Sequence, residues 1–265
     1  MDMPEYEVFA IKYGDRVGTR GQIFMHGDPH DAPLAMDYFL WAIRSDERTV
    51  VVDVGYGQAE GERRGRSFLR CPTEGLALLD IDAAAVEDVI ITHMHYDHAG
   101  NLGLFPNARF HIQDDEMAFV TGRAMTHSAF RHSFVLSDVL EMVTLTYGER
   151  VVFHDGDEEL FPGITLHHMP GHTRGLQSVR VHTKRGWVML ASDAAHYYEG
   201  MEKGLPFMTH EDMFKMLESY RKLQRLAPTP QHIVPGHDPL VLQRYPAPSS
   251  DLEGIVACLD VSPSC

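Results

Sequence analysis

The stretch Thr92-His93-Met94-His95-Tyr96-Asp97-His98-Ala99-Gly100-Asn101 places three histidines and one aspartate within six positions of the chain. Such a density of imidazole and carboxylate groups is typical of a metal site. A helical zinc motif needs histidines four residues apart on one helix face, whereas His93 and His95 are two apart. The spacing therefore predicts that the stretch is not helical.

The residues before this stretch indicate its place in the fold. Residues 86–92 are a β-branched, apolar run that predicts a buried strand, so the potential ligands fall where that strand ends. At a strand end, His93, His95 and Asp97 can share one side. His98 can then approach the same point from the following turn.

Three later segments place one potential ligand at the end of an apolar run. His172 and His237 each follow a Pro-Gly pair, and Asp193 follows the run 186–191. The candidate metal ligands are thus His93, His95, Asp97, His98, His172, Asp193 and His237. They are sufficient for two zinc ions, which about 3.5 to 4 Å apart can share a carboxylate and a hydroxide. Because zinc has no redox chemistry, such a site is predicted to be hydrolytic.

The remaining pattern predicts a mixed α/β fold. Apolar and alternating runs predict further strands at 7–12, 39–43, 49–53, 108–113, 151–154, 164–168, 177–181 and 186–191. Helical segments are expected within 72–80, 116–120, 121–148 and 211–226. Asp114 or Asp115 is expected to cap the second of these. A loop is expected over 21–37, and the tail from Pro246 is expected to lie on the surface. No linker divides the sequence, so residues 1–265 are predicted to form a single domain.

Composition excludes several classes of protein. The formal net charge of −15 argues against a nucleic-acid partner, which needs a basic surface. No run of about 18 apolar residues predicts a membrane span. The acidic start, residues 1–7, is unlike a signal peptide, so a cytoplasmic location is expected. Three distant cysteines, Cys71, Cys258 and Cys265, indicate neither a disulfide framework nor a cysteine zinc site.

Other residues are candidates for supporting roles. Asp53 ends a buried strand, and a buried carboxylate needs a partner, so we expect it to support the metal-binding loop from behind the ligands. Phe24 and Met25 either line an apolar substrate pocket or close the edge of the core. Residues 121–148, rich in Met and Phe, suit either a lid over an apolar substrate or a homodimer contact, and the sequence does not choose between them.

The pattern H-x-H-x-D-H, followed at long intervals by single His, Asp and His residues, resembles the metallo-β-lactamase superfamily over nearly the whole chain. The resemblance implies an αββα sandwich with two Zn²⁺ ions, or other divalent metals, at one edge of the two sheets. Asp53 matches the structural aspartate of an early Asp-x-Gly turn. Asp193 would bridge the ions, and the resemblance divides the other ligands into His93, His95 and His172 at the first metal and Asp97, His98 and His237 at the second.

Within the superfamily the chain is most similar to N-acyl homoserine lactonases, through residues 37–41, 91–93 and 192–194. The bridging position holds Asp193 where the common zinc β-lactamases have Cys. For this branch the resemblance implies that a metal-bridging hydroxide attacks a lactone carbonyl polarised by one metal, while the other metal stabilises the leaving ring oxygen. The implied substrate is a small lactone or ester with an apolar part, such as a quorum-sensing signal.

One position departs from the lactonase pattern. Well-known members carry a tyrosine three residues after the bridging aspartate, where this chain has His196, with Tyr197 and Tyr198 following. Either His196 or Tyr197 could donate a hydrogen bond or a proton to the substrate, or these residues only pack beneath the site. The candidate catalytic residues are therefore Asp97, His196 and Tyr197.

Two alternatives to a lactonase stay open. A related hydrolase would cleave another ester, thioester, amide or aromatic lactone in a catabolic pathway. A mononuclear iron dioxygenase of the same superfamily would use only two histidines and one aspartate. A nuclease is disfavoured by the acidic charge balance, and a structural zinc site would need only four ligands in a closed arrangement.

Overall fold

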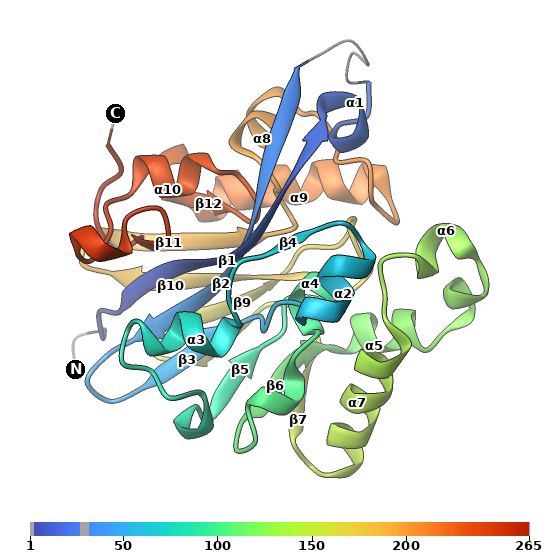
Figure 1. The fold of residues 1–265 in the computed structure, drawn as a ribbon, viewed down its shortest axis with the longest axis horizontal. Coiled ribbons are helices and arrows are strands. Elements are labelled where there is room, and N and C mark those ends of the chain that lie inside the picture. The colour runs from blue at the N-terminus through green and yellow to red at the C-terminus, as the bar shows by residue number, and fades with distance from the viewer. Residues whose placement is uncertain (1–2, 27–31, 265) are drawn as a thin grey trace.

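The structure is a computed structural model that describes residues 3–26 and 32–264. Two β-sheets pack face to face, with helices over their outer faces (Figure 1). The larger sheet has eight strands in the order β13-β1-β2-β3-β5-β6-β7, with β4 beside β1. Its strands are β1 (Glu7–Thr19), β2 (Pro33–Arg44), β3 (Thr49–Val52), β4 (Ser67–Phe68), β5 (Asp88–Ile90), β6 (Arg109–Gln113), β7 (Val151–His154) and β13 (Val256–Cys258).

The smaller sheet has five strands in the order β12-β11-β10-β9-β8. They are β8 (Glu158–Phe161), β9 (Ile164–His168), β10 (Gln177–Thr183), β11 (Gly186–Ser192) and β12 (Ile233–Pro235). Each sheet contains a group of parallel strands, whose carboxyl ends lie at the same edge of that sheet. They include β3, β5 and β6 in the larger sheet and β11 and β12 in the smaller. The αββα sandwich expected from the sequence is confirmed.

Alternation along the strands produces two separate apolar layers. Val50 and Val52 of β3 are fully buried in the cluster between the sheets, where they join Leu166 and Val179 of the opposite sheet. Val51, between them in sequence, is also fully buried but belongs to the cluster beneath the helices. A strand covered on both faces therefore reads as the continuous apolar run seen in the sequence.

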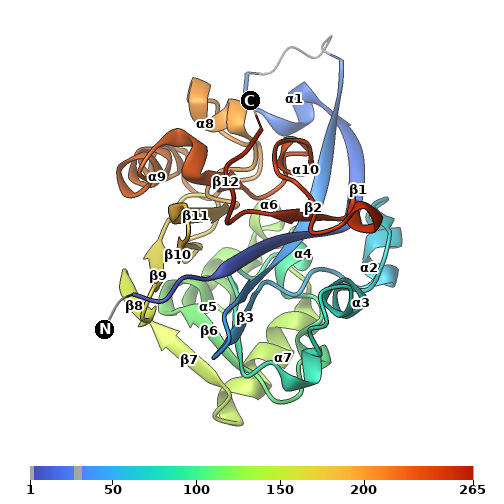
Figure 2. The ribbon, with the colours of Figure 1, turned by 90° about the vertical axis from the view of Figure 1, so that its left-hand side faces the viewer.

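The helices cover the sandwich from both sides (Figures 1 and 2). They are α1 (Arg20–Ile23), α2 (Gln58–Arg63), α3 (Pro72–Ala77), α4 (Tyr96–Ala99), α5 (Asp114–Val120), α6 (Ser128–Arg131), α7 (Leu136–Tyr147), α8 (Tyr198–Lys203), α9 (Met213–Leu226) and α10 (Leu240–Arg244). Single 3₁₀ turns lie at Ala83–Ala85, Leu102–Leu104, Arg123–Thr126, Pro230–His232 and Ser250–Leu252. The predicted helix within 211–226 is present as α9, and Tyr220 and Leu223 of its expected apolar face are buried, but Met213 and Phe214 are exposed and Met216 is buried instead.

The predicted loop over 21–37 is wrong at both ends. Helix α1 occupies its beginning, and β2 begins at Pro33 and pairs with β1 as far as Thr19. The hydrogen bonds of this long hairpin hold the backbone extended where the side chains show little alternation. Residues 27–31, at its tip, lie outside the described part of the chain.

The prediction for the C-terminal tail is also wrong. Strand β13 pairs antiparallel with β1 through Phe9, Ala10 and Ile11, and Figure 2 shows the red C-terminal segment beside dark-blue β1. Val256 and Ala257 are almost completely buried. This strand is stabilised by a partner about 250 positions away in sequence, so its three residues carry little local signal.

A smaller difference concerns the start of one helix. Helix α5 begins at Asp114 with Gln113 as its N-cap, so neither Asp114 nor Asp115 is the cap. Cys71 and Cys258 are free thiols, and Cys265 lies outside the described residues. Within the described ranges no helix is long and apolar enough to cross a membrane.

Candidate metal centre

The histidine-rich stretch begins two residues after β5. Its first half has a non-helical backbone and its second half forms a helical turn. His93 and His95 are in non-helical backbone, as the two-residue spacing predicts. The second half differs from the expected turn, because α4 carries Asp97 and His98 on a single helical turn that follows His95. Adjacent residues on a helical turn point in different directions, so Asp97 and His98 reach the same region from different sides.

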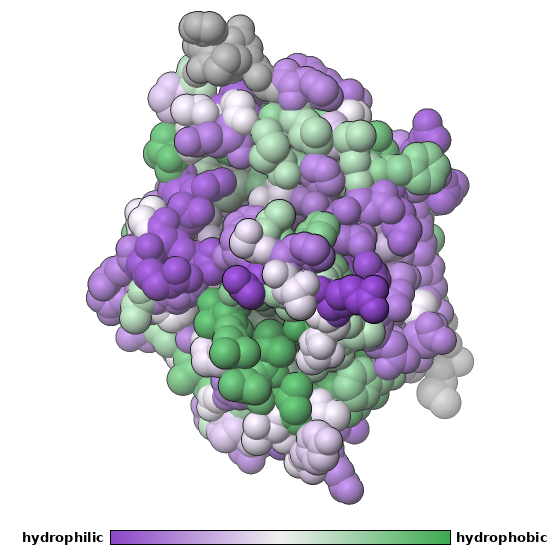
Figure 3. Space-filling model, turned by 90° about the vertical axis from the view of Figure 1, so that its right-hand side faces the viewer, coloured by the Kyte–Doolittle hydropathy of each residue, from purple (hydrophilic) through white to green (hydrophobic). Residues whose placement is uncertain are grey.

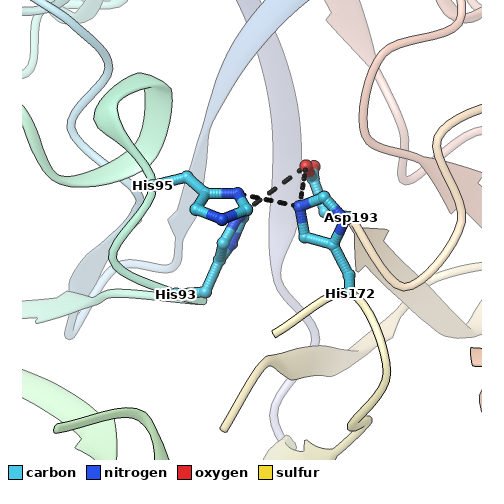
Figure 4. A group of neighbouring side chains, drawn as sticks. All are labelled: His93, His95, His172 and Asp193. Carbon is cyan, nitrogen blue, oxygen red and sulfur yellow. Dashed lines mark hydrogen bonds and ion pairs between the residues drawn. The ribbon is translucent and has the colours of Figure 1, made fainter. Parts of the chain in front are cut away.

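The later candidates reach this region from other strand ends. His172 lies in the connection between β9 and β10, Asp193 directly follows β11, and His237 follows β12. All seven predicted ligands are buried, with exposed fractions of 8% or less. Figure 4 shows His93 and His95 facing His172 and Asp193 across a small space.

The two carboxylate oxygens of Asp193 face different groups of histidines. Oδ2 lies 3.1 Å from Nε2 of His172 and 3.7 Å from Nε2 of His93. Oδ1 lies 2.9 Å from Nε2 of His237 and 3.3 Å from Nε2 of His98. A carboxylate placed in this way has one oxygen available to each of two neighbouring ions.

Backbone carbonyl groups orient two of the imidazoles. Nδ1 of His172 is 2.7 Å from the carbonyl oxygen of Thr209, and Nδ1 of His237 is 2.8 Å from that of Asp37. A carbonyl oxygen can only accept, so each Nδ1 carries the hydrogen and donates it. Each Nε2 is therefore the nitrogen that faces the site and could bind a metal ion, and that of His172 also lies 2.9 Å from Nδ1 of His95.

Asp53 supports the histidine stretch from below. It is fully buried in the left-handed conformation, with φ of +62°, and accepts hydrogen bonds from the backbone N–H and the hydroxyl of Thr92, at 2.7 and 2.8 Å. Its Oδ2 is also 2.8 Å from Nδ1 of His98. These contacts hold the His98 ring with Nε2 towards Asp193.

Glu116 is a supporting residue that the sequence analysis did not find. Its buried carboxylate accepts hydrogen bonds from the backbone N–H of Met94 at 2.9 Å, the hydroxyl of Thr173 at 2.6 Å and the N–H of Gly175 at 3.0 Å. It therefore joins the loop of His93 and His95 to the loop that carries His172. In the sequence it is the last of three consecutive acidic residues at the start of a helix, and nothing local distinguishes it from the other two.

Burial and neighbouring charges set the protonation states at the site. Burial lowers the pKa of His93 and of His95 well below the usual value, and adjacent histidines lower both further. Burial alone would raise the pKa of Asp193, but His196, His237 and other histidines around it bring that pKa well below its usual range. At His98 and His237 burial alone would lower the pKa, but the charge of Asp193 acts against it and raises the pKa of both. A metal ion binding here would displace their protons, whereas His93 and His95 are already neutral.

Several polar atoms in this cluster have no hydrogen-bond partner among the described residues. They include Nε2 of His93, Nε2 of His98 and Oδ1 of Asp193, all buried. Burying polar atoms without partners is costly unless a ligand satisfies them. The side chains of the cluster form three groups that could each hold an ion. These groups are His93, His95, His172 and Asp193; Asp97, His98 and His237; and Asp193, His196 and His237. The donor set thus fits divalent metal ions.

The two predicted catalytic helpers differ in position. Nε2 of His196 lies 3.0 Å from Oδ2 of Asp193, and its ring stacks on Phe207 with centroids 3.4 Å apart. Burial lowers the pKa of His196 to about 3, so its imidazole is neutral. Tyr197 instead donates its hydroxyl hydrogen to the carbonyl oxygen of Ala35 at 3.0 Å and does not line the pocket described below. The structure therefore favours His196.

A pocket of about 230 Å³ opens over the cluster. Phe24 and Met25, predicted to line a substrate pocket, are not on its surface, because Phe24 packs in the core against Tyr197. The residues that line the pocket beside the histidines are instead mostly polar: Arg16, Tyr38, Arg64, Arg66, Tyr96 and Ser133. The hydroxyl groups of Tyr38 and Tyr96 lie 3.2 Å apart.

The sequence profile of the Metallo-beta-lactamase superfamily matches residues 38–237. This range contains most of both sheets and all seven clustered residues, and the chain belongs to this superfamily. Among characterised proteins, an N-acyl homoserine lactonase of a Bacillus species is 33% identical over 152 residues, which are 57% of this chain and 55% of that protein. A probable metallo-hydrolase of Mycobacterium tuberculosis is 26% identical over 210 residues, 69% of this chain and 64% of that protein. The chain thus spans little more than half the length of the first of these relatives.

Solved structures show the same fold. A quorum-quenching N-acyl homoserine lactone lactonase superposes with a TM-score of 0.75 at 23% identity, covering 90% of this chain and 94% of that one. AidC, described as a dizinc quorum-quenching lactonase, gives a TM-score of 0.71 at 17% identity, with 90% of each chain covered. At these identities the likeness concerns the architecture.

Proposed function

We propose that this protein is a hydrolase that binds two divalent metal ions, zinc foremost, and opens lactone rings, with N-acyl homoserine lactones as the leading substrates. The observation that carries the proposal is the convergence of buried imidazole nitrogens on both oxygens of Asp193, several of them without any other partner. The similarity to N-acyl homoserine lactonases supports the substrate class.

The proposed ligands divide as the orientation of Asp193 suggests. Asp193 contributes one oxygen to each ion, and the other ligands are His93, His95 and His172 at the first ion and Asp97, His98 and His237 at the second. Asp53 orients His98, and backbone carbonyls orient His172 and His237. Ions bound here would polarise a substrate carbonyl and lower the pKa of a water molecule towards 7.

The chain's own groups would position the substrate. Asp97, proposed as both ligand and catalytic residue, lines the pocket beside Tyr38 and Tyr96, whose hydroxyl groups can donate to a carbonyl or ring oxygen. The neutral imidazole of His196, stacked on Phe207, can donate one hydrogen bond at the place where the lactonase pattern has tyrosine. Burial of these donors reduces competition from water.

The experiment combines metal analysis with hydrolysis. Purified protein should retain about two zinc ions per chain by mass spectrometry of the metals, and should open N-butanoyl- and N-hexanoyl-homoserine lactone. His93→Ala should lose metal and hydrolysis together, whereas His127→Ala, at an exposed position, should change neither. Equal hydrolysis by chelated, metal-free protein would disprove the proposal. A single iron with oxygen uptake would support the dioxygenase alternative.

A second candidate is hydrolysis of another small ester or lactone. The polar pocket favours it, because a lining that includes Arg16, Arg64 and Arg66 is poorly suited to a long alkyl chain. Rates across a panel of acyl homoserine lactones, aromatic lactones and thioesters would separate the two candidate functions.

We further propose that residues 1–265 form one hydrolase domain. The C-terminal strand β13 pairs with the N-terminal strand β1, so both ends of the chain belong to the same sheet.

A further inference from the structure

Three arginines line the pocket that contains the candidate metal ligands. Arg16 comes from β1, and Arg64 and Arg66 lie between α2 and β4. Gly65 separates the last two with φ of +65°, a conformation that glycine adopts at little cost, and this turn brings both side chains to the pocket. Because the chain as a whole carries a formal charge of −15, average composition does not account for this group of cations.

Among the described residues one carboxylate pairs with these arginines, and it is shared with a fourth arginine. Oε1 of Glu60 lies 2.5 Å from Nε of Arg64, but it also lies 2.6 Å from Nη2 of Arg63, which is outside the pocket. Nη2 of Arg64 is buried without a hydrogen-bond partner among the described residues. One carboxylate thus faces two guanidinium groups, and one donor of Arg64 remains unused.

Within the part of the chain that the structure describes, the other two arginines form hydrogen bonds to neutral groups. Nε of Arg16 lies 3.2 Å from the thioether sulfur of Met36, which is a weak acceptor. Arg66 donates from Nε to the hydroxyl of Tyr96 at 3.2 Å and from Nη1 to the carbonyl oxygen of Arg64 at 2.9 Å. Within the described ranges neither Arg16 nor Arg66 forms an ion pair, so their positive charge is available to a ligand.

A second cavity adjoins this pocket and differs in chemistry. It has a volume of about 170 Å³ and shares His95, His132 and His172 with the first. Its own lining includes Phe119, Phe130 and Phe134, together with the polar side chains of His210 and Glu211, and no arginine among the described residues. A ligand whose reacting bond lies at the shared histidines can therefore extend an apolar part in one direction and a charged part in the other.

We propose that the substrate carries a carboxylate in addition to the bond that is hydrolysed, and that Arg16, Arg64 and Arg66 bind this carboxylate. Guanidinium groups bind carboxylates through paired, charge-assisted hydrogen bonds, which are among the stronger polar contacts in proteins. The apolar part of the substrate occupies the phenylalanine-lined cavity. This inference rests on the proposed hydrolase function and specifies its substrate class as anionic lactones or esters.

The test compares two lactones that differ in one charged group. N-succinyl-homoserine lactone and N-butanoyl-homoserine lactone have acyl chains of equal length, but the first ends in a carboxylate. We expect kcat/KM of the metal-loaded protein to be at least about 10-fold higher for the succinyl compound, a difference of about 1.4 kcal/mol. This preference should decrease with added salt, because screening weakens the attraction.

Variants assign the preference to the arginines. Arg16→Gln and Arg66→Gln, tested separately because Arg66 also holds Tyr96, should reduce the ratio of the two kcat/KM values towards 1. Arg66→Lys should restore part of it. Arg221→Gln is the control, since Arg221 is an exposed arginine that neither lines the pocket nor pairs with Glu60, and it should leave the ratio unchanged.

Binding without turnover separates this inference from the proposed function. Calorimetry with the corresponding γ-lactams, 3-(succinylamino)- and 3-(butanoylamino)-pyrrolidin-2-one, in which N–H replaces the ring oxygen, needs no hydrolysis and should show a Kd at least about 10-fold lower for the former. If neither lactone is hydrolysed, the proposed function fails, and this binding ratio still decides whether the arginines form a carboxylate site. Equal kcat/KM and equal Kd for the two compounds, or a preference that survives both glutamine variants, would overturn the inference.

Discussion

Oε2 of Glu116 lies 2.6 Å from the hydroxyl oxygen of Thr173, and this hydrogen bond joins helix α5 to the loop that carries His172. The other oxygen of Glu116 holds the backbone of Met94, between His93 and His95. One carboxylate thus fixes the distance between two loops that supply candidate ligands to the same ion. Loops positioned in this way need not reorganise when the metal binds.

Replacing Glu116 should therefore weaken both the fold and metal binding. Glu116→Ala leaves two buried N–H groups and one hydroxyl without an acceptor, and should reduce the free energy of unfolding by about 2 to 4 kcal/mol. Thermal unfolding and zinc titration measure the two effects. Asp114→Ala, an exposed acidic residue of the same helix, is the control. A variant with unchanged zinc affinity would show that Glu116 stabilises the fold alone.

Asp53→Asn should affect one of the two proposed ions more than the other. The amide cannot accept from both donors of Thr92 and also from Nδ1 of His98, so the His98 ring loses its orientation. We expect zinc affinity at the ion held by Asp97, His98 and His237 to fall by about 10- to 100-fold. Competition with a chromophoric chelator would resolve the two affinities. Two unchanged affinities would contradict the proposed support.

Asp138, in α7, should make stability depend on pH. Burial raises its pKa to about 6, with contributions from Glu60 and Glu141, and opposing effects from Ser137 and Arg64. The unfolded value is about 3.9, so the folded protein binds this proton more tightly, and the ionised form costs stability above pH 6. Asp138→Asn should raise the free energy of unfolding at pH 7.5 by about 1 to 3 kcal/mol and by much less at pH 4. Denaturant unfolding at both pH values measures this, and an equal effect at the two would refute it.

The strand formed by the C-terminal tail should be necessary for stability. Val256 is a buried residue of β13, the strand that pairs with β1 at the edge of the larger sheet. Val256→Asp places a charge in this apolar contact and should destabilise the protein by about 3 kcal/mol or more, measured by denaturant unfolding. Glu253→Asp, an exposed neighbour in sequence, should have little effect. A tail that only lies on the surface would tolerate both changes equally.

The homodimer expected from the sequence stays a prediction. Figure 3 shows hydrophobic side chains on the face that carries α6 and α7, and α7 exposes Leu136, Leu140 and Tyr147. If this surface forms the contact, light scattering should give twice the mass of the chain, and Leu140→Glu should yield the monomer. Leu78→Glu, at an exposed position in another segment, is the control. A monomeric mass for the unaltered protein would remove the prediction.

Much of the candidate site could be predicted because its residues stand at strand ends. His93, His172, Asp193 and His237 each follow an apolar run, and a buried strand delivers its following residue to the edge of its sheet. The residues that were not predicted have no such position. Glu116 is one acidic residue among three, and Arg16 lies within a long strand, so neither differs locally from a surface residue.

The choice between pocket and core for Phe24 and Met25, and the position of the tail, could not be predicted for a related reason. Phe24 and Met25 are apolar residues beside a site, but which side chains face a cavity depends on how the β1–β2 hairpin packs against Phe207 and α8. The short strand β13 exists only because β1 offers it an edge. Both outcomes depend on contacts between distant segments.

The sequence by itself determined the mixed α/β class and the seven candidate ligands, because hydrophobic periodicity and metal-binding residue types are local properties of the chain; the αββα arrangement followed from the resemblance to the superfamily. The tertiary structure alone decided that Asp193 faces two groups of histidines, that Glu116 ties two ligand loops together, and that three arginines line the pocket. These relationships depend on side-chain directions across the sandwich, which arise only when the two sheets pack.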